Sequence, residues 1–237
     1  MQGTQKEPMT PSAEERPKPT RPDVPLSRDR ILATAVRIAD EHGISAVTMR
    51  RVAARLGAKP MSLYNHVADK GDILDGMVDR VIEQVDLADT GADWREAMRR
   101  RAVSARQVFR RHPWAPSLLD SRTSSGPSRL RYLDRVLGTL VRAGFALDHA
   151  ARAFSLLDSY VYGFGIQQVN FSEGSTLPPE QRAEALLAAI PAEAFPYLHR
   201  MATQATVASY DPDADFAFGL DIILDGLART LGPSAAG

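Results

Sequence analysis

Residues suited to contacting a polyanion gather between residues 48 and 66, which read TMRRVAARLGAKPMSLYNH. Arginine and lysine bind phosphate oxygens, and ammonium or amide groups pair with base edges in the major groove. By donor and acceptor geometry, Lys59 suits guanine and Asn65 suits adenine. Thr48 stands before a helical pattern, where backbone N–H groups and the helix dipole favour a phosphate. The chemistry indicated is recognition of duplex DNA.

The elements that would position these side chains are two short helices joined by a glycine turn. Val52, Ala53 and Leu56 share one face of the first helix, and Gly57 ends it. Pro60 lies at the first turn of the second helix, where its missing N–H costs little. This pattern predicts a helix-turn-helix whose second helix enters the major groove. It also suits an ordinary packing unit, so a helical interaction module that binds no DNA remains an alternative.

Charge is distributed unevenly along a chain whose formal net charge is zero. The block from Arg28 to Lys70 contains eight basic and four acidic residues, and the block from Phe171 to Gly237 contains three basic and nine acidic residues. This asymmetry is typical of a protein with one end facing a polyanion. A chance fluctuation is the alternative.

Helical periodicity recurs throughout the 237 residues, and no useful stretch alternates with a period of two. We therefore expect an all-α fold of about ten helices. Residues 1–26 form a proline-rich arm that we expect to be disordered, residues 27–72 a three-helix DNA-binding domain, and residues 73–237 a larger ligand-binding and dimerisation domain. The expected helices after the third lie near 69–85, 93–111, 113–120, 127–143, 147–171, 180–202 (interrupted at Pro191) and 214–231.

The stretch from Ile31 to Leu74 resembles the DNA-binding domain of the tetracycline-repressor (TetR) family. The resemblance rests on the turn around Gly57, on Leu63, Tyr64 and His66, and on the following Asp69 and Lys70. The segment RAGFALDHAARAFSLLDSYVYGFGIQQ, residues 142–168, is similar to the regulatory domain of the tetracycline-repressor subgroup. The resemblance implies a dimeric repressor that a small molecule releases from a palindromic operator, although an activator remains an alternative.

The resemblance also assigns roles to residues. Leu63 is expected in the domain core, Tyr64 and His66 at phosphates, and Lys70 at the DNA backbone. The residues expected to face DNA are Thr48, Arg50, Lys59, Pro60, Met61, Ser62, Tyr64, Asn65, His66 and Lys70.

The expected helices near 147–171 and 214–231 are apolar nearly all round, which is typical of helices buried on more than one side. In the family these helices form a four-helix bundle with their copies in a second subunit. The residues expected at this dimer interface are Leu156, Tyr162, Ile166, Phe218, Ile222 and Leu227.

The effector pocket is predicted from the inward stripe of the helix near 93–111 and from aromatic residues. Arg101 lies on that stripe, where it meets either an acidic or carbonyl group of the effector or an internal carboxylate such as Asp158. The effector is expected to be a small, mostly hydrophobic organic compound. For each aromatic candidate, core packing is the alternative. The residues expected to line the pocket are Trp94, Met98, Arg101, Phe109, Trp114, Tyr132, Phe154, Leu157, Tyr160 and Phe164.

Other function classes find little support in the sequence. The chain has no cysteine, its five histidines show no metal-ligand spacing, and no phosphate loop or nucleophile elbow is present. We expect no metal, no cofactor and no enzyme activity. The histidine with which tetracycline repressors hold the drug–magnesium chelate falls on Leu119, so a different inducer is expected. Without a signal sequence or an apolar stretch long enough for a membrane, the expected location is cytoplasmic.

Overall fold

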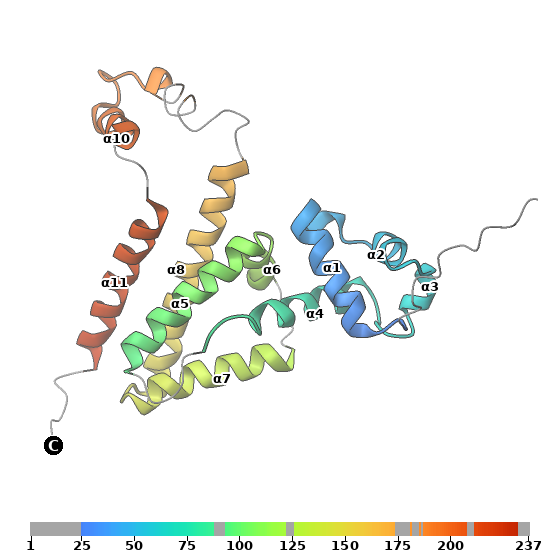
Figure 1. Ribbon diagram of the computed structural model, residues 1–237. Coiled ribbons are helices and arrows are strands. Elements are labelled where there is room, and N and C mark those ends of the chain that lie inside the picture. Colours follow the sequence, from blue (N-terminus) through green and yellow to red (C-terminus); the bar gives the residue numbers. More distant parts are fainter. Residues whose placement is uncertain are drawn as a thin grey trace, which may run out of the picture.

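The structure is a computed structural model that describes residues 25–87, 93–121, 126–173, 181, 185, 187–207 and 211–231. Within these residues every regular element is a helix, which confirms the all-α expectation (Figure 1). The elements in chain order are α1 (Arg28–His42), the 3₁₀ turn η1 (Ile44–Ala46), α2 (Met49–Leu56), α3 (Pro60–Leu63), α4 (Lys70–Ile82), α5 (Trp94–Arg111), α6 (Ala115–Ser121), α7 (Pro127–Arg142), α8 (Leu147–Glu173), α10 (Pro196–Val207) and α11 (Pro212–Thr230).

Helix ends in the N-terminal region fall where side chains and glycines satisfy the backbone. The Ser27 hydroxyl accepts a hydrogen bond from the backbone N–H of Arg30 at 3.3 Å, and α1 begins there. The Thr48 hydroxyl caps α2 in the same way. At the other end of α2, Gly57 adopts a left-handed conformation with φ 69°, which glycine tolerates without a steric penalty. The local rules of capping thus fix the turn between α2 and α3.

Several of the expected boundaries are wrong. The fourth helix, expected near 69–85, ends at Ile82. The second helix of the helix-turn-helix, for which the sequence pattern covers residues 60–66, ends at Leu63 and continues as a turn. The last helix begins at Pro212, because the Asp211 carboxylate accepts from two backbone N–H groups and caps it. The helix expected over residues 180–202 lies partly outside the described residues; within them, residues 181, 185 and 187–189 are helical and the expected interruption at Pro191 is present, but α10 begins only at Pro196 and continues to Val207. Pro196 is preorganised for the first turn of a helix, so it starts α10. Residues 1–24 of the expected arm also lie outside the described residues.

The N-terminal helices pack around one apolar cluster. Ile31 and Ile38 of α1, Val52 of α2 and Leu63 of α3 are all fully buried in it. α4 lies against α1 so closely that a Cβ at Gly76 would come within 2.6 Å of the Leu32 side chain. A larger residue at this crossing would therefore require the end of the Leu32 side chain to move.

α4 also connects the two halves of the chain. It packs on α1 at one side and on α6 and α7 at the other (Figure 1). The Asp79 carboxylate of α4 accepts hydrogen bonds from the first backbone N–H groups of α7, those of Ser128 and Arg129, at 3.2 and 3.1 Å. The domain boundary expected between residues 72 and 73 falls inside this helix and stays a prediction.

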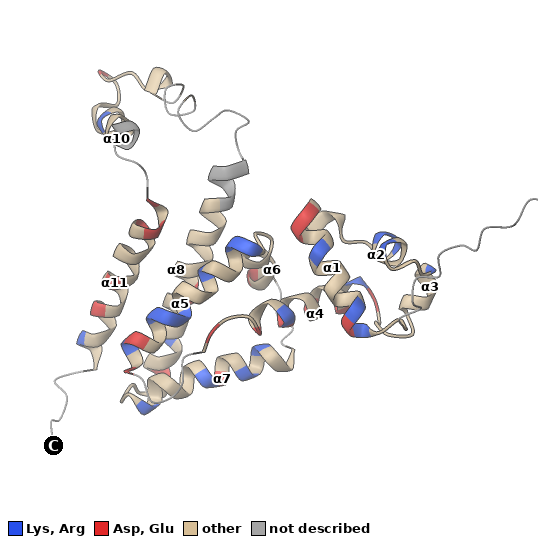
Figure 2. Cartoon of the chain, viewed as in Figure 1, with Lys and Arg blue, Asp and Glu red and all other residues tan. Residues whose placement is uncertain are grey.

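The C-terminal helices surround α8, which packs against α5, α6, α7 and α11. Ion pairs join α5 to α11: Arg95 with Asp225, Arg99 with Asp221, and Arg106 with Asp213. In Figure 2 the ribbon of α5 carries several basic positions, in blue, and that of α11 several acidic positions, in red. Paired charges therefore fix the position of α11 against its own subunit.

Candidate DNA-binding surface and effector cavity

The turn between α2 and α3 and the residues on either side of it include exposed polar and basic side chains. Figure 2 marks the basic positions of α2 in blue. Lys59, Pro60 and Asn65 are exposed, and the side chains of Met61 and Tyr64 are 74% and 47% exposed. Leu63 is completely buried and anchors α3 to the domain core, as expected. The buried Leu63 therefore holds α3 in place while Pro60 and Met61 of the same helix are exposed.

The basic side chains of this surface are available to bind phosphate groups. Among the described residues, no carboxylate forms an ion pair with Arg50, Arg51, Lys59 or Lys70. Arg55 differs, because it binds Glu41 of α1 through two hydrogen bonds of 2.6 and 2.7 Å. That hydrogen bond lowers the pKa of Glu41 below its ordinary value.

The remaining predicted contacts differ in exposure. Thr48 and Lys70 are exposed, Thr48 as the N-cap of α2 and Lys70 in the first turn of α4. Ser62 and His66 are half-buried. The helix-turn-helix geometry thus places the predicted set around one recognition helix, and contact of each residue with DNA stays a prediction.

A cavity of about 430 Å³ opens between α4, α6, α7 and α8. This volume lies within the range of about 300–1,000 Å³ that is usual for small-molecule sites. Apolar side chains, hydroxyl groups and charged groups share its wall. The lining residues are Ile82, Leu119, Asp120, Arg129, Tyr132, Leu133, Phe154, Ser155, Asp158, Ser159, Tyr162, Gly163 and Ile166.

Behind this wall lies a buried ion pair. Nη1 of Arg101, whose side chain is 1% exposed, donates to the Asp158 carboxylate at 2.7 Å and also to the Tyr132 hydroxyl. The Tyr162 hydroxyl donates to the other Asp158 oxygen at 2.9 Å. The guanidinium lies over the rings of Tyr132 and Phe154, each 5.6 Å from its centroid. Of the two alternatives for Arg101, the structure shows the internal carboxylate.

Burial and charge together shift the pKa values of this network. Burial alone would lower the pKa of Arg101, but Tyr132 and Asp158 beside it raise that pKa above its ordinary value. Burial raises the pKa of Tyr132 to about 12. Burial and the neighbouring Asp158 also raise the pKa of Tyr162. Both tyrosines therefore stay protonated at neutral pH and offer neutral hydroxyls to the cavity.

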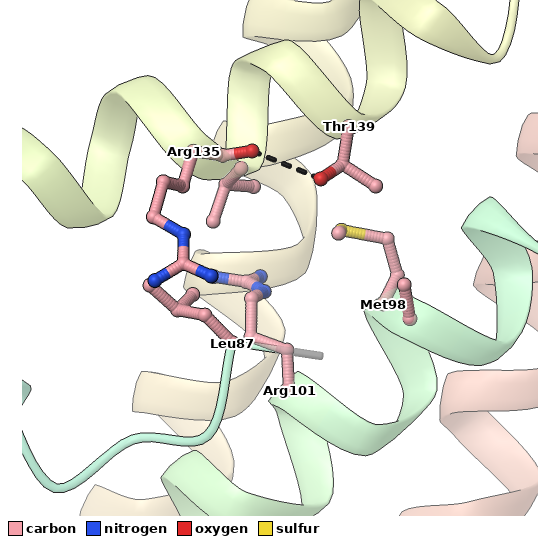
Figure 3. A pocket seen from close by; sticks show the side chains of 7 residues that line it. Leu87, Met98, Arg101, Arg135 and Thr139 are labelled. Atoms are coloured by element: carbon pink, nitrogen blue, oxygen red, sulfur yellow. Dashed lines mark hydrogen bonds between the residues drawn. The ribbon is translucent and has the colours of Figure 1, made fainter. Parts of the chain in front are cut away.

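A second, much smaller void lies on the other side of Arg101 (Figure 3). It measures about 10 Å³, which is room for one water molecule. Arg101 and Met98 of α5 meet Arg135 and Thr139 of α7 around it, with Leu87 at its edge. Nε and Nη2 of Arg101 have no hydrogen-bond partner among the described residues. The void is too small for an effector.

The structure brings only some of the predicted pocket residues to the larger cavity. Tyr132 and Phe154 line it, whereas Met98 and Arg101 line the small void. Leu157 is fully buried. The other predicted aromatic residues contact neighbouring side chains: Trp94 packs on Phe145, Phe109 on Tyr162, Tyr160 and Phe164 on Phe216, and the Trp114 indole donates to Asp40.

Sequence reasoning missed the small residues of the cavity wall. Ser155, Ser159 and Gly163 recur every four residues on α8 and line the cavity from one side. A stripe of small residues in an otherwise bulky helix was the signal for this space. Arg129 and Leu133, four residues apart on α7, line the opposite wall and were also missed.

The predicted dimer residues fall into two groups. Leu156 on α8 and Phe218 and Ile222 on α11 are 48%, 71% and 57% exposed. Tyr162 and Ile166 are half-buried and line the cavity, and Leu227 is half-buried. The exposed apolar face of α8 and α11 therefore suits a second subunit, and its role stays a prediction.

Two absences can be stated for the described residues. In that part of the chain, no three His, Asp or Glu side chains gather closely enough to hold a metal ion. No helix there has the length and hydrophobicity needed to cross a membrane.

Comparisons with known proteins agree with both halves of this description. The model of bacterial regulatory proteins of the tetR family matches residues 31–77, and that of the tetracyclin repressor-like C-terminal domain matches residues 87–231. The HTH-type transcriptional repressor DrrR1 of Streptomyces coeruleorubidus is 37% identical over 219 residues, which are 89% of this chain and 78% of that protein. Tetracycline repressor protein class D of Escherichia coli is 25% identical over 206 residues, 85% of this chain and 88% of that repressor.

Solved structures agree as well. The structure of ActR from Streptomyces coelicolor in complex with actinorhodin superimposes with a TM-score of 0.75 at 30% identity, covering 89% of this chain and 100% of ActR. The chain therefore belongs to the tetracycline-repressor (TetR) family of bacterial transcriptional regulators, whose members bind DNA with an N-terminal helix-turn-helix and respond to ligands through a helical C-terminal domain.

Proposed function

We propose that this chain is a homodimeric repressor that an organic effector, bound in the 430 Å³ cavity, releases from a palindromic operator. The observation that carries the proposal is the pairing of an exposed, basic recognition helix with a cavity of ligand size in one chain. α4 reaches both sites, since it packs on α1 and contributes Ile82 to the cavity wall.

The dimer follows from the exposed apolar face of α8 and α11. Leu156, Phe218 and Ile222 are large apolar side chains that would remain in water in a single subunit. A two-fold axis through this face brings two recognition helices to one side of the duplex, about one helical turn apart. The operator is therefore an inverted repeat.

DNA selection tests this proposal directly. Duplexes enriched from a random pool should contain an inverted repeat with half-sites about 10 bp apart, and their affinity should fall steeply with salt. Lys70→Ala should weaken all duplexes about equally, because Lys70 is assigned to the backbone. Lys59→Ala and Asn65→Ala should relax the preference at one position per half-site, by about 1–3 kcal/mol. A monomer with equal affinity for every duplex contradicts the proposal.

The cavity wall defines the effector class. Phe154, Leu119 and Leu133 suit an apolar body, whereas the hydroxyls of Tyr132 and Tyr162 suit carbonyl or hydroxyl groups. ActR, solved with actinorhodin, shows that a relative with this fold accommodates an organic compound. Actinorhodin is therefore a first probe, and a compound library screened for operator release is the wider test.

The sign of regulation is tested in the cell. A repressor predicts that deletion of the gene raises transcription from the promoter that contains the selected operator. A fall in transcription would indicate an activator instead.

A further inference from the structure

A polar cluster outside the cavity joins the DNA-binding helices to the effector domain. Asp40 lies in the last turn of α1, and His112 and Trp114 lie in the turn between α5 and α6. One oxygen of Asp40 accepts two hydrogen bonds, from Nε1 of Trp114 at 2.7 Å and from Nδ1 of His112 at 2.8 Å. His112 and Trp114 are buried and Asp40 is exposed, so the contact lies at the edge of the effector domain, with its two donors held inside.

The cluster is continuous with the cavity through α6. Trp114 directly precedes α6, and Leu119 and Asp120 of α6 line the cavity. α6 is also tightly packed on α8, because a Cβ at Gly165 would approach Pro116 to 3.2 Å. A displacement of α6 by an occupant of the cavity would therefore be passed to Trp114.

The cluster also lies next to a contact with α2, the helix that precedes the recognition helix. Glu41, the neighbour of Asp40, holds Arg55 of α2 through two hydrogen bonds. The last turn of α1 thus carries two adjacent carboxylates, one bound to the effector domain and one bound to the helix-turn-helix. The amide of Gln84, just beyond α4, lies 3.2 Å from Nε2 of His112 and adds α4 to the same junction.

We propose that Asp40, His112 and Trp114 are positioning residues that transmit occupation of the cavity to the DNA-binding domain. This inference rests on the proposed function, because it assumes that the cavity controls operator affinity. Coupling between two sites needs an element whose position both sites influence. The turn before α6 meets this condition, since it is joined to the cavity wall on one side and to α1 on the other.

A cavity-filling variant tests the inference without an identified effector. Gly163 lines the cavity, and a Cβ added there meets no atom within 4 Å, so Gly163→Phe places an aromatic ring in the empty space. The probe is the operator duplex obtained by selection, and the measurement is its dissociation constant by fluorescence anisotropy. Gly163→Phe should weaken operator binding by about tenfold, within the usual range of allosteric coupling.

The transmitting role predicts that this weakening depends on Asp40. In an Asp40→Asn background, Gly163→Phe should change operator affinity by less than about threefold. Asp134→Asn is the matched control, because it makes the same change at an exposed carboxylate of α7 outside the cluster, so the full tenfold effect should persist. Trp114→Phe removes the indole N–H donor together with the pyrrole ring but keeps an aromatic side chain, and it should act as Asp40→Asn does.

Every outcome of these binding measurements either supports the inference or overturns it. The inference is overturned if Gly163→Phe weakens operator binding equally in the wild-type, Asp40→Asn and Trp114→Phe backgrounds, or if it weakens binding in none. Thermal unfolding and sedimentation verify folded dimers, and Ser155→Phe fills the cavity from the same helix if Gly163→Phe disturbs assembly. If the wild type itself selects no duplex, the proposed function fails instead.

Discussion

The buried pair of Arg101 and Asp158 leads to an asymmetric prediction for stability. Asp158→Ala removes the only carboxylate that is hydrogen-bonded to a guanidinium of 1% exposure. Arg101 would keep the Tyr132 hydroxyl as its only hydrogen-bond partner among the described residues. Arg101→Met removes the charge instead, and Asp158 keeps the Tyr162 hydroxyl and its place at the cavity wall.

The magnitudes follow from this difference. Leaving a buried charge without its partner costs about 3–5 kcal/mol, so Asp158→Ala should lower the free energy of unfolding by that amount. Arg101→Met should cost less than half as much. It also eliminates the unpartnered Nε and Nη2, and each buried unsatisfied donor costs about 1–3 kcal/mol. The double variant Arg101→Met/Asp158→Ala should be more stable than Asp158→Ala alone.

Urea unfolding measures these differences, with dimer concentration held constant because dissociation and unfolding are linked. Equal slopes of the unfolding curves are the control for a common unfolded state. The reasoning is refuted if Arg101→Met costs more than Asp158→Ala, or if the effects of the two sites simply add in the double variant.

Three further predictions concern other parts of the fold. Gly57→Ala should destabilise the protein by about 1–2 kcal/mol, because the backbone φ of residue 57 is 69°. Gly163→Ala, in the middle of α8, is the control and should not lower the melting temperature. Equal changes in melting temperature for the two variants would contradict the argument from backbone conformation. Phe218→Asp should convert the dimer to a monomer in sedimentation, while Met61→Asp, equally exposed but on α3, should leave the dimer intact. Burial holds the pKa of Tyr132 at about 12, above the ordinary value of about 10, so the folded state retains this proton. The stability it contributes is complete below pH about 10 and lost between pH 10 and 12, and Tyr132→Phe should flatten that part of the stability–pH curve.

Local signals made the DNA-binding half predictable from the sequence. Gly57 ends α2 as expected, and Ser27 and Thr48 cap their helices, because each feature depends only on neighbouring residues. The end of α3 depends on tertiary packing instead. Leu63 enters the core and the chain turns directly after it, which helical periodicity does not reveal.

The effector cavity was harder to predict, because periodicity identifies inward faces but not what each face meets. Trp94 and Tyr160 are correctly placed on inward stripes, yet they pack on Phe145 and Phe216. A cavity exists where side chains are small, so Ser159 and Gly163 were more informative than the aromatic residues. The assignment of the exposed α8 and α11 face to a dimer, and of residues 27–72 to a separate domain, are still predictions.

The ion pair also changes what the cavity requires of an effector. Taken from the sequence, Arg101 on an inward face suited an acidic or carbonyl group of the ligand. In the structure Asp158 neutralises that charge from within the wall. The other charged lining residues, Asp120 and Arg129, are also of opposite sign, so the wall and its buried partner carry two positive and two negative charges. An anionic group of the effector would therefore have to compete with Asp158 for the guanidinium of Arg101, which is buried behind the cavity wall. The choice among effectors should depend instead on the two neutral tyrosine hydroxyls. They favour a compound whose polar groups lie where they can hydrogen-bond these hydroxyls, because a buried polar group without a partner destabilises the complex by more than a matched hydrogen bond stabilises it. The structure thus favours an uncharged effector over an acidic one.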